Sequence, residues 1–197
     1  MSAGHHADSS IAARVRRLEV LVEDRGLVGG EDLDAILDRV LSGSSPANGT
    51  KIVARAWVDP AFRARLLTDA NSAIEELGFS MGAGPQPQLL RVVENTPEVH
   101  NLVVCTLCSC YPLSLLGPSP SWYKSLAYRS RAVRDPRGVL EEFGLHLAAD
   151  VEIRVWDASA ETRYLVLPQA PPGGLERSED ELAELVTRSG MIGAAAL

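Results

Sequence analysis

Apolar residues recur every three or four positions through the first part of the chain, and glycines follow the runs. This spacing places the apolar side chains on one face of a helix, which a glycine often ends. The pattern predicts helices over residues 11–22, 33–41 and 49–58, with shorter helices up to Gly78. Such regular stripes need a surface to bury them, so we expect the main body or a partner chain to cover some of them.

The second part of the chain changes character. Runs rich in β-branched residues predict strands over residues 88–94, 99–104, 151–156 and 163–167. Between and after them, helices are predicted over residues 122–133, from Pro136 to Gly144, and after Ser178, where Glu181 completes a capping box. Helices come first and strands later, without regular alternation. We therefore expect an α+β fold in which a helical arm, residues 1–80, precedes a mixed α/β globular domain in layers, residues 81–197.

Composition and charge narrow the class of protein. Of 197 residues, 46% are apolar and 23% are charged, which is typical of a soluble globular chain. The net charge of −7 argues against nucleic acid as a partner, and we interpret the basic run Arg129, Arg131 and Arg134 as an interface or a solvated helix face. No run is apolar enough to span a membrane, and the N-terminus lacks a signal-peptide pattern, so we expect a cytoplasmic protein without a membrane partner.

All three cysteines lie in one stretch, VVCTLCSCYP, directly after the second predicted strand. Structural zinc needs four protein ligands, and no fourth ligand is near. His100 lies at the far end of the strand, roughly 16 Å away at 3.3 Å per residue, and His146 could arrive only through the fold. Three thiols with an open position fit a catalytic metal better than a structural one.

The spacing of the cysteines adds a second clue. Cys108 and Cys110 flank a single residue, so both thiolates reach one ion only if the backbone between them wraps tightly around it. The amide nitrogens of Ser109 and Cys110 would then face the metal. Two nitrogens and three sulfurs form a claw with one open position, which favours a trivalent transition metal over zinc.

The motif VCTLCSC followed by Tyr111-Pro112 resembles the metal-binding claw of the nitrile hydratase α subunit. The similarity continues from about Gln86 through ENTPEVHN, WYKSLAYRSRAVRDPRGVLEEFG, VEIRVWD, AETRYLVLP and ELVTRSGMIG, which together cover over half the chain. The N-terminal helices are similar to the arm with which that family embraces a β subunit. The resemblance implies an enzyme that hydrates a nitrile to an amide.

The resemblance also implies a ligand set. Cys105, Cys108 and Cys110, with the amides of Ser109 and Cys110, would hold one low-spin trivalent ion. Thr106 after the first cysteine resembles the cobalt type rather than the iron type, which makes iron(III) the lesser alternative. By the same match, Cys108 would be oxidised to sulfinic acid and Cys110 to sulfenic acid, while Cys105 stays a thiolate. Whether activated water or the Cys110 sulfenate attacks the nitrile is left open.

Further residues match family positions around the metal loop. Two interpretations of Ser109 stay open: a small residue that a tight turn requires, and a hydroxyl that acts within the claw. Gln86 matches a pocket glutamine, although beside two prolines it also reads as an ordinary loop residue. Asp157, Glu161 and Arg163 match residues behind the loop. Glu161 and Arg163 could instead form a solvated salt bridge, which would contribute little to stability. We favour the interpretation in which all three residues lie behind the ligands and orient them.

One departure concerns the substrate pocket. Cobalt members commonly read CYPWP after the claw, whereas this chain reads CYPLS. Leu113 in place of an indole leaves more room, so we expect a bulky or heteroaromatic nitrile rather than a simple aliphatic one.

The resemblance also implies partners. The arginines that grip the oxidised sulfurs come from the β subunit in this family, so we expect a β-type partner and weak activity of this chain alone. A small cobalt-loading helper protein is a further expected partner. Two alternatives stay open: the related thiocyanate hydrolase γ subunit, and a non-catalytic metal-binding or redox-sensing module.

Overall fold

The computed structural model describes residues 4–81, 88–108, 110–173 and 176–195. The chain divides into two compact units, Met1–Gly43 and Ser44–Leu197. The first unit holds α1 (Gly4–Asp24) and α2 (Gly30–Ser42). Large apolar side chains of both helices are exposed, among them Ile11, Val15, Leu18, Leu21, Ile36, Leu37 and Leu41. The apolar stripes expected over residues 11–22 and 33–41 thus lie on helices, and these side chains are exposed within the part of the chain that the structure describes.

The second unit begins with three helices: α3 (Pro46–Val58), α4 (Pro60–Thr68) and α5 (Ala70–Glu75). Asp59 separates the first two, because its extended backbone ends α3 while its carboxylate accepts from the Phe62 N–H at 2.9 Å and caps α4. Ile52, Leu66 and Ile74 are at most 1% exposed. These helices belong to the core of the second unit, which begins at Ser44.

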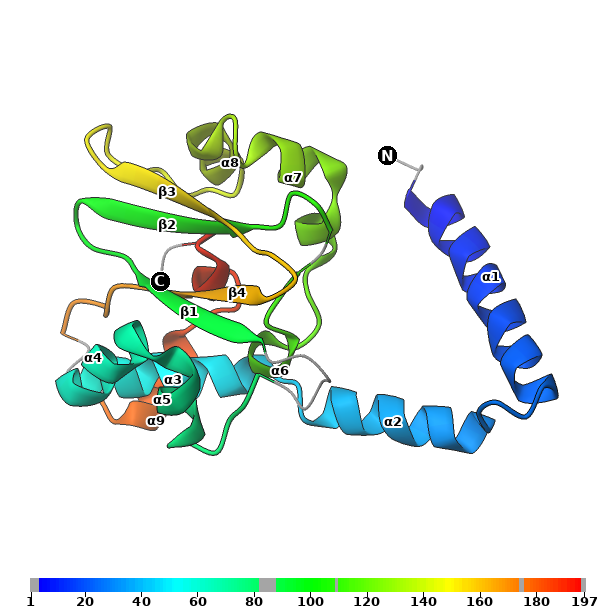
Figure 1. Ribbon diagram of the computed structural model, residues 1–197. Coiled ribbons are helices and arrows are strands. Elements are labelled where there is room, and N and C mark those ends of the chain that lie inside the picture. The colour runs from blue at the N-terminus through cyan, green and yellow to red at the C-terminus, as the bar shows by residue number, and fades with distance from the viewer. Residues whose placement is uncertain (1–3, 82–87, 109, 174–175, 196–197) are drawn as a thin grey trace. The chain divides into compact units, whose positions relative to one another are not determined.

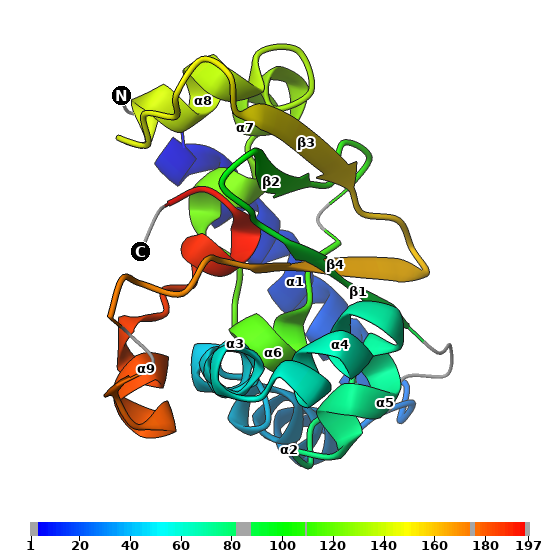
Figure 2. The same ribbon diagram turned by 90° about the vertical axis from the view of Figure 1, so that its left-hand side faces the viewer.

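Four strands form two parallel pairs (Figure 1). β1 (Leu89–Glu94) pairs with β4 (Thr162–Leu167), and β2 (Val99–Val104) pairs with β3 (Glu152–Asp157). Figure 2 shows α7 and α8 beside β2 and β3, whereas α3, α4 and α5 lie by β1 and β4. The second unit thus has helices outside and strands inside, and the expected α+β class is confirmed.

The remaining helices are short: α6 (Leu113–Leu116), η1 (Ser121–Lys124), α7 (Leu126–Arg131), α8 (Pro136–Glu142), α9 (Glu179–Leu185) and η3 (Gly190–Ile192). The single helix expected over residues 122–133 is divided, because the extended Ser125 caps α7 by accepting from the Tyr128 N–H at 3.1 Å. The capping box of Ser178 and Glu181 is confirmed. No helix in the described ranges is both long and apolar enough to cross a lipid bilayer.

A buried polar network ties the ends of these strands together. Asn95 Oδ1 accepts from the Asn101 N–H at 2.8 Å, so the Asn95 amide nitrogen faces His100 Nδ1 at 3.3 Å. His100 Nε2 lies 2.7 Å from the Gly193 carbonyl oxygen, which only accepts. The imidazole is therefore neutral with its proton on Nε2, and burial lowers its pKa. Both ring nitrogens are committed to the fold, which agrees with the exclusion of His100 as a metal ligand.

Candidate metal centre

The cysteine loop begins where a parallel strand pair ends. Val104 of β2 is opposite Asp157 of β3, and its carbonyl accepts from the Ala158 N–H at 2.7 Å. Cys105 is the first residue beyond this ladder and is fully buried. Because both strands end at the same edge, the side chain at the end of β3 is delivered to the start of the loop.

The three thiols converge. The Sγ atoms of Cys105 and Cys108 are 3.3 Å apart, and those of Cys108 and Cys110 are 3.0 Å apart. All three lie within 4.8 Å of one another, as one ion would require. Cys105 Sγ also accepts from the Cys108 N–H at 3.3 Å, so the backbone already curls around the first sulfur. Ser109 lies outside the described residues.

The three thiols differ in exposure. Cys105 is buried, Cys110 is half-buried and Cys108 is exposed. Burial raises the pKa of the Cys110 thiol to about 12, and its hydrogen bond with Cys108 adds to the rise, while the charge of Arg163 opposes it. A bound cation would replace the proton that Cys110 otherwise keeps. Soft donors at this spacing therefore fit a thiolate-binding transition metal.

Thr106 is held from the side of β3. The Asp157 carboxylate accepts from the Thr106 N–H at 2.9 Å and from its hydroxyl at 2.5 Å. Among the residues expected behind the loop, Asp157 is thus the one that bonds directly to the described part of the loop. The contact spans 51 positions in sequence and follows from the parallel register.

Glu161 lies in the turn between β3 and β4, and Arg163 lies in β4. The Ser159 hydroxyl donates to the Glu161 carboxylate at 2.9 Å, which keeps that side chain within the turn. Arg163 is 9% exposed and donates through Nη1 to the Ser159 and Ala160 carbonyls, while its Nε has no partner within the residues that the structure describes. No ion pair joins the two side chains within the described parts of the chain. Arg163 instead leaves its charge near Cys110.

Three residues that the sequence pattern did not assign to the site also hold the loop or the strand before it. Arg129 of α7 donates to the Cys105 and Thr106 carbonyls, at 3.1 and 2.7 Å. The Tyr123 hydroxyl donates to the Cys110 carbonyl at 2.9 Å, and the Tyr128 hydroxyl donates to the Val103 carbonyl at 2.6 Å. Arg131 instead pairs with Glu142 at 2.7 Å. The basic run therefore divides, and only Arg131 and Arg134 fit the expected solvated face.

The expected pocket residues are less defined. Leu113 is the first residue of α6 and is 37% exposed. Gln86 lies outside the described residues. Tyr111 is buried against Tyr123, with ring centroids 5.2 Å apart, and its hydroxyl has no hydrogen-bond partner among the described residues. Tyr111 thus packs in the core of the second unit.

A fold with paired parallel strands and three converging thiols at their carboxyl edge defines a thiolate metal-binding α+β protein. The family model described as "Nitrile hydratase, alpha chain" matches residues 9–195. The chain belongs to this family, as its cysteine motif and flanking blocks indicated.

Individual relatives agree with this placement. The chain is 54% identical over 187 residues to the low-molecular weight cobalt-containing nitrile hydratase subunit alpha of Rhodococcus rhodochrous, covering 95% of this chain and 89% of that one. It is 42% identical over 189 residues to the thiocyanate hydrolase subunit gamma of Thiobacillus thioparus, covering 92% and 76%. A double mutant of the Fe-type nitrile hydratase from Comamonas testosteroni Ni1 superposes with a TM-score of 0.89 at 43% identity, covering 96% and 91%.

Proposed function

We propose that this chain is the metal-bearing α subunit of a cobalt-dependent nitrile hydratase, which adds water to a nitrile to form an amide. The observation that carries the proposal is the convergence of three Sγ atoms within 4.8 Å at the end of β2. Membership of the family supports the same reaction class.

We infer that Cys105, Cys108 and Cys110 hold the ion through sulfur, together with the amide nitrogens of Ser109 and Cys110. Trivalent cobalt would supply Lewis acidity toward the nitrile or toward water. Thr106 and a relative that is named cobalt-containing favour cobalt. A structural neighbour named Fe-type keeps iron as the alternative.

The exposure of the thiols supports an order of oxidation. An oxidant such as dioxygen reaches exposed thiolates first. Cys108 is exposed and Cys110 half-buried, which suits sulfinic and sulfenic acids at these positions, whereas the buried Cys105 stays a thiolate. Arg163 places a buried positive charge near Cys110, where it would stabilise an oxidised, anionic sulfur. We assign the catalytic role to Cys110 and, by the family match, to Ser109. Asp157 would orient the loop and Arg163 would balance its charge. Glu161 would hold the adjoining turn.

The partner and the compartment belong to the same proposal. The exposed apolar faces of α1 and α2 form the surface that would contact a β-type subunit. A helper protein would load the cobalt before assembly. We place the chain in the cytoplasm, where its thiols stay reduced until the metal arrives.

The substrate proposal depends on Leu113 and Gln86. A leucine on the surface of α6 leaves more room than an indole, so we propose a bulky heteroaromatic nitrile, such as the nucleoside toyocamycin. Leu113→Trp should lower kcat/KM for such a nitrile about 10-fold or more and leave a small aliphatic nitrile less affected. Equal effects on both nitriles would contradict the pocket assignment.

The second candidate is thiocyanate hydrolysis, which the 42% identical relative favours. The chain is co-expressed with its partner subunit and cobalt, purified as the complex, and offered an aliphatic nitrile, a heteroaromatic nitrile and thiocyanate in turn. Amide formation supports the nitrile hydratase. Turnover of thiocyanate alone supports the second candidate, and a cobalt-loaded complex that turns over none of the three would support a sensing module.

A further inference from the structure

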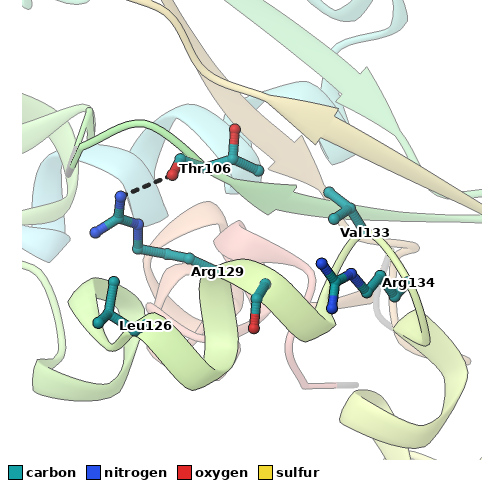
Figure 3. Close-up of a pocket in the computed structure, with 6 residues that line it drawn as sticks. Thr106, Leu126, Arg129, Val133 and Arg134 are labelled. Carbon is teal, nitrogen blue, oxygen red and sulfur yellow. Dashed lines mark hydrogen bonds between the residues drawn. The ribbon is translucent and has the colours of Figure 1, made fainter.

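Arg129 reaches from α7 to the start of the cysteine loop. Its Nε donates to the Cys105 carbonyl at 3.1 Å, and its Nη2 donates to the Thr106 carbonyl at 2.7 Å. Figure 3 shows the guanidinium turned toward Thr106, with Arg134 at the other end of the same cavity. The arginine is half-buried and serves two successive carbonyls with one planar group.

These carbonyls need a donor from outside the loop. The ladder between β2 and β3 ends with the bond from Ala158 to Val104, so the next two carbonyls have no strand partner. Cys105 is fully buried, and a buried carbonyl without a partner is costly. An arginine suits the place because its fork donates two bonds in fixed geometry, which a lysine cannot do.

Asp157 holds the same residue by other atoms. Its carboxylate takes the N–H and the hydroxyl of Thr106, whereas Arg129 takes the carbonyl. Every polar group of Thr106 is therefore bound by a charged side chain, one from β3 and one from α7. The backbone is thus fixed at Cys105, which carries the first of the three sulfurs, and at the residue directly after it.

We propose that Arg129 is a positioning residue of the metal centre, which fixes the backbone of Cys105 and Thr106 and thereby aims the Cys105 sulfur at the other two. This role rests on the proposed cobalt site. Within the described ranges, Arg129 has hydrogen bonds to backbone carbonyls of the loop and none to a cysteine sulfur, so it would act through the loop backbone.

The turn that follows α7 supplies a matched control. Arg134 lines the same cavity of about 260 Å³, together with Leu126, Ser130 and Val133. No side-chain hydrogen bond or ion pair joins Arg134 to another residue in the described ranges. Because the cavity borders Arg129, water can enter when that side chain is shortened, and we expect its variants to fold.

The test uses the complex of this chain with its partner subunit, as wild type and as Arg129→Gln, Arg129→Lys, Arg134→Gln and Tyr128→Phe. Tyr128→Phe removes a buried bond to β2, so it controls for lost stability alone. Two readouts are taken: amide hydrogen exchange of the loop in the metal-free complex, and the rate at which loaded cobalt is lost to a chelator.

For Arg129→Gln we expect loop exchange to rise and cobalt loss to quicken by about 10- to 100-fold, the range for groups that orient metal ligands. Arg129→Lys should fall between Gln and wild type, and both controls should match wild type. The proposal would be overturned if Arg129→Gln showed the loop exchange and cobalt retention of the wild type. It would also be overturned if Tyr128→Phe changed both readouts as much as Arg129→Gln does. If wild type takes up no cobalt, the proposed function fails, and the exchange data alone then decide whether Arg129 positions the loop.

Discussion

The carboxylate of Asp157 binds Thr106 twice, through the backbone N–H at 2.9 Å and through the hydroxyl at 2.5 Å. Asp157 closes β3 and Thr106 lies two residues beyond the end of β2, so the parallel register brings them together. The residue after the first cysteine is therefore an anchor of the loop, and its side chain bonds away from the thiols.

The first prediction concerns this anchor. Thr106→Val keeps the branched shape but removes the hydroxyl, and with it a hydrogen bond to a charged group worth about 1.5–3 kcal/mol. Cobalt retention should fall about 10-fold, while Thr106→Ser, which keeps the hydroxyl, should stay near wild type. The cobalt content per chain after dialysis against a chelator measures retention in both variants. Equal retention in Thr106→Val and in the wild type would contradict the role of Thr106 as an anchor of the loop.

The second prediction compares two tyrosines of one aromatic cluster. Tyr123 donates to the Cys110 carbonyl, whereas Tyr128 donates to Val103 within β2. Removing either hydroxyl should lower the free energy of unfolding by about 1–3 kcal/mol, because each leaves a buried carbonyl unpaired. Only Tyr123→Phe should also reduce cobalt retention. If Tyr128→Phe reduced it equally, the effect would come from stability and not from the loop.

The third prediction compares two glycines with the same φ of +82°. A Cβ on Gly193 would overlap the Asn101 carbonyl oxygen, whereas a Cβ on Gly144 meets nothing within 4 Å. Gly144→Ala should cost roughly 1–2 kcal/mol from the left-handed backbone alone. Gly193→Ala should cost about 4 kcal/mol or more, since overlap is added. Chemical denaturation measures both, and similar costs would refute the close approach of the C-terminal segment to β2.

The fourth prediction concerns acid stability. His100 has its pKa lowered from 6.5 by burial, so the unfolded chain takes up a proton at this residue before the native one does. The stability it contributes is complete above pH 6.5 and falls as the pH drops toward the native pKa. His100→Gln cannot titrate, so its unfolding free energy should decline less between about pH 7.5 and 5.5. Parallel curves for the two proteins would contradict this role.

Local rules predicted much of the fold. Asp59-Pro60 divides two helices, Ser178 opens the last one through its capping box, and Gly78 follows the last of the early helices with a φ of +78°. At Ser125 two local rules compete. The apolar pattern predicts one continuous helix over residues 122–133, whereas the Ser125 side chain caps a new helix within it. The parallel pairing of the strands depends on contacts far apart in sequence, which no local pattern contains.

The site divides in the same way. The spacing of the three cysteines indicated a single metal centre because thiols within six residues of one another lie close together in the folded chain. The sequence pattern predicted an interface or a solvated helix face for Arg129, because this residue lies in a basic run and its contact with Cys105 spans 24 positions. Tyr123 was missed for a similar reason, because its hydroxyl reaches Cys110 only once the aromatic cluster has formed.

The most direct test of the proposed centre is the mass of the tryptic peptide from Val92 to Lys124, which carries all three cysteines, taken from the cobalt-loaded complex after trapping of the labile sulfenic acid. We predict one cobalt per chain and a gain of three oxygens, about 48 Da, with two on Cys108, one on Cys110 and none on Cys105. An unmodified peptide from a complex that holds cobalt, or oxygen on Cys105, would contradict the proposed metal centre.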